Sequence, residues 1–250
     1  MGSEMCIRDR RKPSQKFRWS IHDVGTIIVL AGALLIGLTP LRGRGRLRKL
    51  WLSLLVAYFG LVTGNLLSLA VISGWTAQGI AWHLAPGLAC VLVFSLLLSA
   101  TTKRNLYCSH VCPHGAAQQL LKLRLPDGSD SAAPKNPRRW LKHVRAALKC
   151  VPGLLLFTAT AITILQWDVN FAAWEAFDAW IWYVAGFASL SLGIGSLAVS
   201  AFVPMAYCRY ACATGRLLEY VRHSAAAARF CLADAGAILL AVFAWWKLFQ

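Results

Sequence analysis

The sequence predicts an all-α integral membrane protein, and three observations carry that prediction. Of the 250 residues 58% are hydrophobic and only 14% are charged, a balance that is untypical of a soluble domain. The apolar residues form long blocks, and the basic residues gather in alternate connections between the blocks. We expect helices because open strands would leave backbone groups unsatisfied in lipid.

The apolar blocks are each long enough, or nearly so, to cross roughly 30 Å of hydrocarbon as a helix. They cover residues 21–41, 50–75, 80–101, 146–165, 183–203 and 232–249. The last block is the least regular, because Asp234 lies near its start. We therefore expect about six transmembrane helices, with four as the minimum.

The distribution of charge predicts the orientation of these helices. The formal net charge is +16, but the connections at residues 75–83 and 166–182 contain no Lys or Arg. The other connections carry many, which is the positive-inside pattern of a multi-pass protein in the bacterial inner (cytoplasmic) membrane. A solvated basic face is the alternative interpretation. The alternation favours membrane lipid, and not nucleic acid, as the partner of this chain.

The first 20 residues, which precede the first apolar block, fall into two parts. Residues 1–10 resemble the in-frame translation of a transposon end used to prepare sequencing libraries, so we expect them to be a non-native adapter. Residues 11–20 are basic although the alternation places them outside the cell. A large translocated domain upstream would account for this, so we interpret residues 11–20 as the remnant of a linker to an outer domain. The membrane domain is then residues 21–250.

Two short segments of the membrane domain share one layout. Residues 107–115 and 207–215 each read Y-C-x-x-x-C-x-x-G, and each follows an apolar block and opens into a basic segment. Short helices are expected after them, at residues 115–125 and 215–222. The pattern indicates a weak internal duplication with two cytoplasmic Cys-x-x-x-Cys loops.

The two segments supply four thiols, the number that holds one iron–sulfur cluster or one zinc ion. These are Cys108, Cys112, Cys208 and Cys212. The run from Cys108 to Pro113 matches the C-x-x-x-C-P ending of bacterial ferredoxin motifs. If the spacing is helical, both sulfurs lie on one face, and if it is a loop, the chain wraps part of a cluster. Nearby cations would offset the cluster's charge: Lys103, Arg104, Arg209 and Arg216.

Other chemistry is compatible with the same cysteines. A structural zinc ion could be bound by cysteines at this spacing. Disulfides are disfavoured because the motifs are expected on the cytoplasmic side. Free buried thiols are common as single residues, but they are not expected as two matched pairs. The remaining cysteines Cys90, Cys150 and Cys231 lie in or beside apolar blocks, and we interpret them as small hydrophobic residues.

At these motifs the chain resembles the membrane-bound 4Fe-4S-binding polyferredoxins of the NosR and NapH type, over about residues 21–250. The resemblance implies that Cys108, Cys112, Cys208 and Cys212 are the ligands of a 4Fe-4S cluster. It also implies a flavin-binding domain on the outer side, before the first span. The second motif departs from the family pattern, with Ala213 in place of proline.

We therefore expect a membrane electron-transfer subunit that passes electrons between quinol or a cytoplasmic donor and an outer flavin or other redox partner. It would be a component of an oxidoreductase system with no catalytic residues of its own, and the quinone pool or a redox protein would be its partner. The alternative is a membrane transporter or scaffold whose four cysteines bind structural zinc. A transporter would place functional charges inside the spans, and the six blocks contain almost none.

Overall fold

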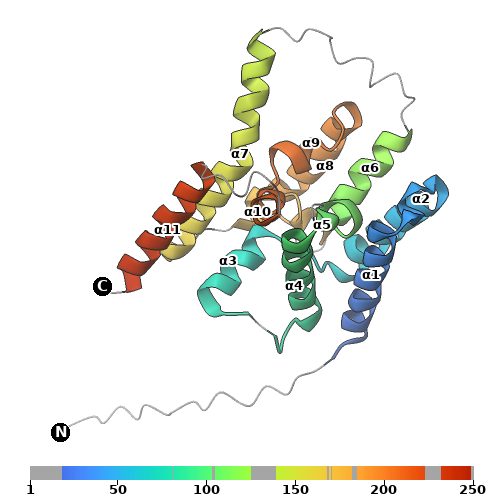
Figure 1. Cartoon of the computed structure of the whole chain (residues 1–250), viewed down its shortest axis with the longest axis horizontal. Coiled ribbons are helices and arrows are strands. Elements are labelled where there is room, and N and C mark those ends of the chain that lie inside the picture. The colour runs from blue at the N-terminus through green and yellow to red at the C-terminus, as the bar shows by residue number, and fades with distance from the viewer. Residues whose placement is uncertain are drawn as a thin grey trace.

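The structure is a computed structural model that describes residues 19–80, 82–102, 105–124, 139–167, 169, 171–181, 185–222 and 232–248. Every regular element within these ranges is helical (Figure 1), so the all-α prediction is confirmed. The α-helices are α1 (Ile21–Leu38), α2 (Gly45–Leu55), α3 (Leu69–Gln78), α4 (Pro86–Thr101), α5 (Leu106–His110), α6 (Pro113–Arg124), α7 (Arg139–Ile164), α8 (Phe187–Phe202), α9 (Ala206–Tyr210), α10 (Ala213–Val221) and α11 (Leu232–Leu248). The adapter and linker predicted at residues 1–20 lie almost wholly outside the described ranges.

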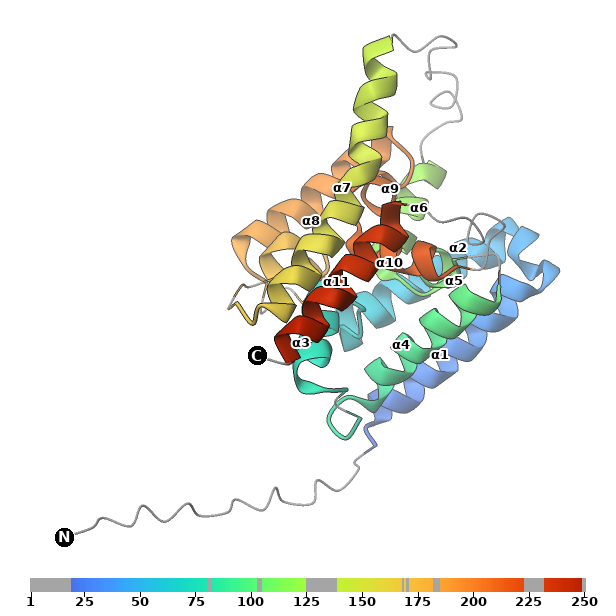
Figure 2. The same ribbon diagram turned by 60° about the vertical axis from the view of Figure 1, so that its left-hand side comes forward.

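Helix α1 begins at a capping box and is tied there to α4. The Ser20 side chain accepts the backbone N–H of His22, and the Asp23 carboxylate accepts the N–H of Ser20 at 2.8 Å. The second Asp23 oxygen accepts the N–H of Gly87 at 2.9 Å. The helices α1 and α4 therefore start at the same end of the molecule and run side by side (Figure 2).

The block at residues 50–75 does not form one helix, so the prediction of a continuous helix there is wrong. Helix α2 continues into a π-helical segment, η2 (Val56–Thr63), which ends at Gly64 with a φ of 61°. Glycine reaches this left-handed conformation without steric cost. The chain then runs non-helically with Leu66 and Leu67 buried, and α3 begins after its N-cap Ser68. Apolar composition alone did not reveal this break.

Two helices are long and apolar enough to cross a membrane by length and composition, Ile21–Leu38 and Ala147–Ile164. Three shorter apolar helices are Pro86–Thr101, Phe187–Phe202 and Ala233–Trp246. These five segments coincide with five of the six predicted blocks. The total of six spans stays a prediction.

The duplication predicted from the motifs appears as two interlocked halves. The first half is α4–α5–α6 and the second is α8–α9–α10. Helix α6 of the first half packs against α8 of the second, and α10 of the second packs against α4 of the first. In the same way α2 covers α6 and α7 covers α10. Each half thus completes the other around one core, in which both cysteine motifs lie.

Candidate iron–sulfur site

The first motif is built from two short helices joined by a kink. The Asn105 side chain caps α5 by accepting the N–H of Cys108 at 3.4 Å. Val111 leaves the helical conformation, while the N–H of Cys112 bonds to the Tyr107 carbonyl at 2.8 Å. Helix α6 then begins at Pro113. The spacing is therefore neither a continuous helical turn nor a loop, the two possibilities that the sequence left open.

The second motif repeats this geometry. Helix α9 ends at Tyr210, and the N–H of Cys212 bonds to the Tyr207 carbonyl at 2.9 Å. Helix α10 begins at Ala213 with Cys212 as its N-cap. Ala213 thus occupies the first helical position, as Pro113 does in α6. Proline fits this position because its missing N–H would have no helical partner, so alanine preserves the fold of the motif.

The tyrosine of each motif fixes the motif to a segment from elsewhere in the chain. The Tyr107 hydroxyl accepts the backbone N–H of Leu67 at 2.9 Å. The Tyr207 hydroxyl accepts the N–H of Ala176 at 3.1 Å. Both bonds are buried, so each hydroxyl satisfies an amide that would otherwise lack a partner. The matched tyrosines are therefore anchors of the site.

The glycine of each motif permits close approach of the two short helices. A Cβ atom at Gly115 would lie 2.3 Å from the Cys108 carbonyl oxygen. A Cβ atom at Gly215 would lie 3.3 Å from Cys212 Sγ and 3.6 Å from the Cys208 oxygen. The second motif is thus the less tightly packed of the two.

The structure brings the four predicted thiols into one neighbourhood. Burial raises the pKa of Cys112 to about 11 and that of Cys208 to about 12. Burial also raises the pKa of Cys108, and the neighbouring Cys208 and Cys112 raise it further. The pKa of Cys212 is raised by burial and then by Cys108 and Cys208. Thiols from both halves therefore interact with one another. Within the described residues, no three His, Cys, Asp or Glu side chains lie close enough to hold a single metal ion.

Hydrogen-bond donors point at these sulfurs. The Gly215 N–H donates to Cys212 Sγ at 3.1 Å, and the N–H groups of Gly115 and His114 lower the pKa of Cys112 by hydrogen bonding. The Gln118 side chain donates to Cys208 Sγ at 3.7 Å. Such donors stabilise negative charge on sulfur and tune iron–sulfur centres. The donor set of four thiols with N–H partners therefore fits a cluster.

A cavity of about 560 Å³ opens beside the second cysteine pair and is lined by both of its cysteines. The other lining residues are Lys149, Pro152, Arg209, Tyr210, Gly215, Arg216 and Glu219. Arg216 forms an ion pair with Glu219 at 2.9 Å. Of the cations predicted to offset a cluster, Arg209 and Arg216 therefore lie at the site, and Lys103 and Arg104 lie outside the described residues.

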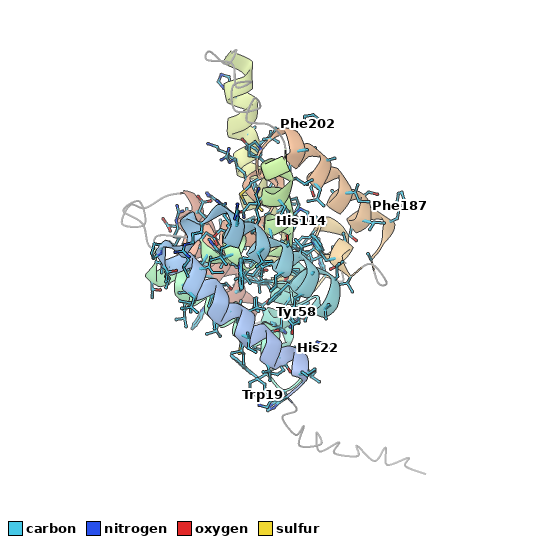
Figure 3. The ribbon with its side chains drawn as sticks, turned by 90° about the vertical axis from the view of Figure 1, so that its right-hand side faces the viewer. Trp19, His22, Tyr58, His114, Phe187 and Phe202 are labelled. Atoms are coloured by element: carbon cyan, nitrogen blue, oxygen red, sulfur yellow. The ribbon has the colours of Figure 1, made fainter. Side chains whose placement is uncertain are left out.

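His114 is a central residue of the site that sequence reasoning missed (Figure 3). Its ring is 1% exposed, and burial lowers its pKa to about 4. Nδ1 accepts the indole N–H of Trp180 at 3.3 Å, so Nε2 carries the proton and donates to Ser196 Oγ at 3.0 Å. The ring also packs edge-on against Tyr207, with 4.7 Å between centroids. His114 thus joins the start of α6 to the second half.

Glu175 is the second residue that sequence reasoning missed, because it lies in the connection at residues 166–182, which the charge pattern places on the outer side. It is 3% exposed and follows the short helix η4 (Phe171–Trp174). One carboxylate oxygen bonds the N–H of Leu69, at the start of α3. Burial raises the pKa of Glu175 to about 8. Its other oxygen and the hydroxyl of the nearby Thr214 have no hydrogen-bond partner among the described residues.

The remaining cysteines take different positions. Cys90 packs against the core as a small hydrophobic residue, which is the role that the sequence predicted. Cys150 is exposed on α7, and Cys231 lies outside the described residues.

Comparison with known families gives one result that covers both motifs. Residues 84–126 and 185–229 each match a 4Fe-4S binding domain, so each half of the duplication matches separately. No curated protein and no solved structure matched the chain. The chain is therefore an iron–sulfur protein, and its cofactor is a cluster of the 4Fe-4S type.

Proposed function

We propose that this chain is a membrane electron-transfer subunit in which Cys108, Cys112, Cys208 and Cys212 together hold one 4Fe-4S cluster. The observation that carries the proposal is the interlocking of the two halves. Each half supplies two thiols, a closed cluster needs four ligands, and thiols of one half raise the pKa of thiols of the other.

Membrane insertion is supported by where the apolar side chains lie. Phe187 and Phe202 at the two ends of α8 are 87% and 82% exposed, and Ile21 in α1 is 82% exposed. Figure 3 shows both phenylalanines at the periphery of the molecule. Exposed apolar surface on such helices fits contact with lipid. Together with the alternation of Lys and Arg, it supports a multi-pass protein of the bacterial inner membrane with the cysteine motifs toward the cytoplasm.

The proposed electron path joins the cluster to a partner on the other side. The connection at residues 166–182, which the charge pattern assigns to the outer side, contacts the cysteine motifs. The Ala176 N–H bonds to the Tyr207 hydroxyl, and the Trp180 indole N–H bonds to His114. The electron route across the membrane is then shorter than a full span of roughly 30 Å. Quinol, or a flavin domain of the NosR and NapH kind, would exchange electrons at that end. A cytoplasmic donor would use the cavity beside Cys208.

The test is anaerobic purification followed by iron and sulfide analysis and electron paramagnetic resonance. We expect about four irons per chain, a visible absorption bleached by dithionite, and slow or no reduction by a quinol until a partner domain is added. Replacing Cys108 with Ser should remove the iron signal as completely as replacing Cys208. Cys150→Ser is the matched control, since Cys150 lies on the exposed side of α7.

Several outcomes would contradict the proposal. A full-strength cluster in Cys208→Ser would show that the two pairs do not share one site. Zinc in place of iron would favour the alternative, a membrane transporter or scaffold with a structural zinc site. Rapid quinol oxidation by the isolated chain would show that no second component is needed.

A further inference from the structure

The two halves of the site differ at a buried position in the middle of the helix that follows each cysteine pair. Gln118 lies six residues after Cys112, and Leu218 lies six residues after Cys212. Both side chains are 0% exposed. The halves share their tyrosine anchors, kinks and glycines, and at this position an amide in the first half stands where the second half has an apolar side chain.

The amide of Gln118 points across the boundary between the halves. It belongs to α6 of the first half, and its Nε2 lies 3.7 Å from Sγ of Cys208 in the second half. A ligand sulfur offers only lone pairs, so the N–H side of the amide faces it. The acceptor character of the sulfur therefore determines that the NH₂ end of the Gln118 amide faces Cys208.

This arrangement lowers the stability of the fold. The Gln118 oxygen is buried and has no hydrogen-bond partner among the described residues. Leaving such an acceptor unsatisfied destabilises the folded chain, and a leucine at this position would avoid that loss. A buried polar group of this kind calls for a reason other than packing.

We propose that Gln118 sets the reduction potential of the cluster by donating its side-chain N–H to the Cys208 thiolate. The inference rests on the shared cluster of the proposed function. Reduction adds one electron, and its negative charge spreads onto the ligand sulfurs. A donor aimed at one of them stabilises the reduced state and raises the potential. The effect acts on the Cys208 side, which is also the side that faces the cationic cavity.

The test compares Gln118→Leu, which copies the residue of the second half, with the wild-type chain in detergent. At the ambient potential where half of the wild-type cluster is reduced, we expect the ratio of reduced to oxidised cluster in Gln118→Leu to be roughly three- to tenfold lower. Gln119→Leu is the matched control. Gln119 is the next residue of α6 and bonds Arg48 and the Ser109 carbonyl, with no bond to sulfur. Its variant should keep the wild-type ratio.

A second readout separates tuning from a structural role. The metal-free Gln118→Leu protein should be at least as stable as the wild type, because the unsatisfied amide is gone. A structural role would instead lower the unfolding temperature. An unchanged ratio in Gln118→Leu, with its iron content intact, would overturn the inference.

A third measurement keeps the inference testable if Gln118→Leu fails to assemble a cluster. With glutamine side chains labelled with ¹⁵N, the reduced wild-type cluster should show a nitrogen hyperfine coupling that persists in Gln119→Leu. A wild-type cluster without that coupling overturns this inference and leaves the proposed function intact. A wild-type protein without iron overturns both.

Discussion

At the scale of single residues, the buried carboxyl of Glu175 has a measurable consequence for stability. Its pKa in the fold is about 8, against 4.5 in the unfolded chain. Between these values the folded state binds a proton that the unfolded state does not. The contribution of Glu175 to stability is therefore fully present at low pH and is lost as the pH rises through this window, by a few kcal/mol at most.

The variant Glu175→Gln should remove this pH dependence, because the amide copies the protonated carboxyl and still accepts the Leu69 N–H. Unfolding of the metal-free protein in detergent between pH 5 and pH 8 would measure it. Glu219→Gln serves as the control, since Glu219 is half exposed in a surface ion pair and should keep the wild-type slope. A steep fall in stability with rising pH that survives in Glu175→Gln would contradict the prediction.

The two anchoring tyrosines predict a matched pair of effects. Removing either hydroxyl leaves one buried backbone N–H without its acceptor, at Leu67 or at Ala176. Tyr107→Phe and Tyr207→Phe should each cost about 1–3 kcal/mol, measured as chemical unfolding of the metal-free protein. Tyr58→Phe should cost little, because its exposed hydroxyl bonds the His22 carbonyl at 3.5 Å. A large loss in only one of the paired variants would show that the halves are not equivalent.

At the scale of elements, the kinked helix pair depends on its glycine. Gly115→Ala would drive a Cβ into the Cys108 carbonyl at 2.3 Å, and backbone atoms cannot move aside cheaply. We expect a loss of about 1–3 kcal/mol or more, together with reduced iron content on purification.

The second motif should tolerate the same change better, because the nearest atom to a Cβ at Gly215 is 3.3 Å away. Gly74→Ala in α3 is the control. A Cβ there meets nothing within 4 Å, so alanine should stabilise the helix by about 0.5–1 kcal/mol. Equal losses in Gly115→Ala and Gly215→Ala would refute the difference in packing.

The sequence predicted the helices better than their interruptions. Five apolar blocks correspond to α1, α4, α7, α8 and α11, because long apolar runs favour helices. The break after η2 was missed although Gly64-Asn65 is a plausible turn dipeptide, because an uninterrupted apolar run outweighed it.

The site itself was predicted only in part. The four cysteines and the two glycines could be found because their spacing repeats along the chain. His114 and Glu175 could not, since each has its role through contacts with residues more than 60 positions away. Only the first motif has a histidine at that position, so the repeat drew no attention to it.

At the scale of the whole molecule, the arrangement of helices makes the topology testable. In Figure 2 α1 and α4 both begin at the lower end and rise toward α5, which fits the side assigned by the charge pattern. A reporter fused at Ser131 should be cytoplasmic and one at Leu84, which is 75% exposed, should be outside. Leu84 is preferable to residues 171–177, where buried side chains contact the motifs. The same location for both reporters would refute the proposed topology.

The interlocking of the two halves also governs when the protein can be completed during synthesis. Cys112 emerges from the ribosome 100 residues before Cys212 (212 − 112), and at about 5–20 residues per second this interval lasts roughly 5–20 s. During that time the first thiol pair has no partner pair, and α6 lacks α8 to pack against. Cluster delivery must therefore wait for the second half. Nascent chains stalled between α6 and α9 should carry unprotected thiols, vulnerable to oxygen and to stray metal ions.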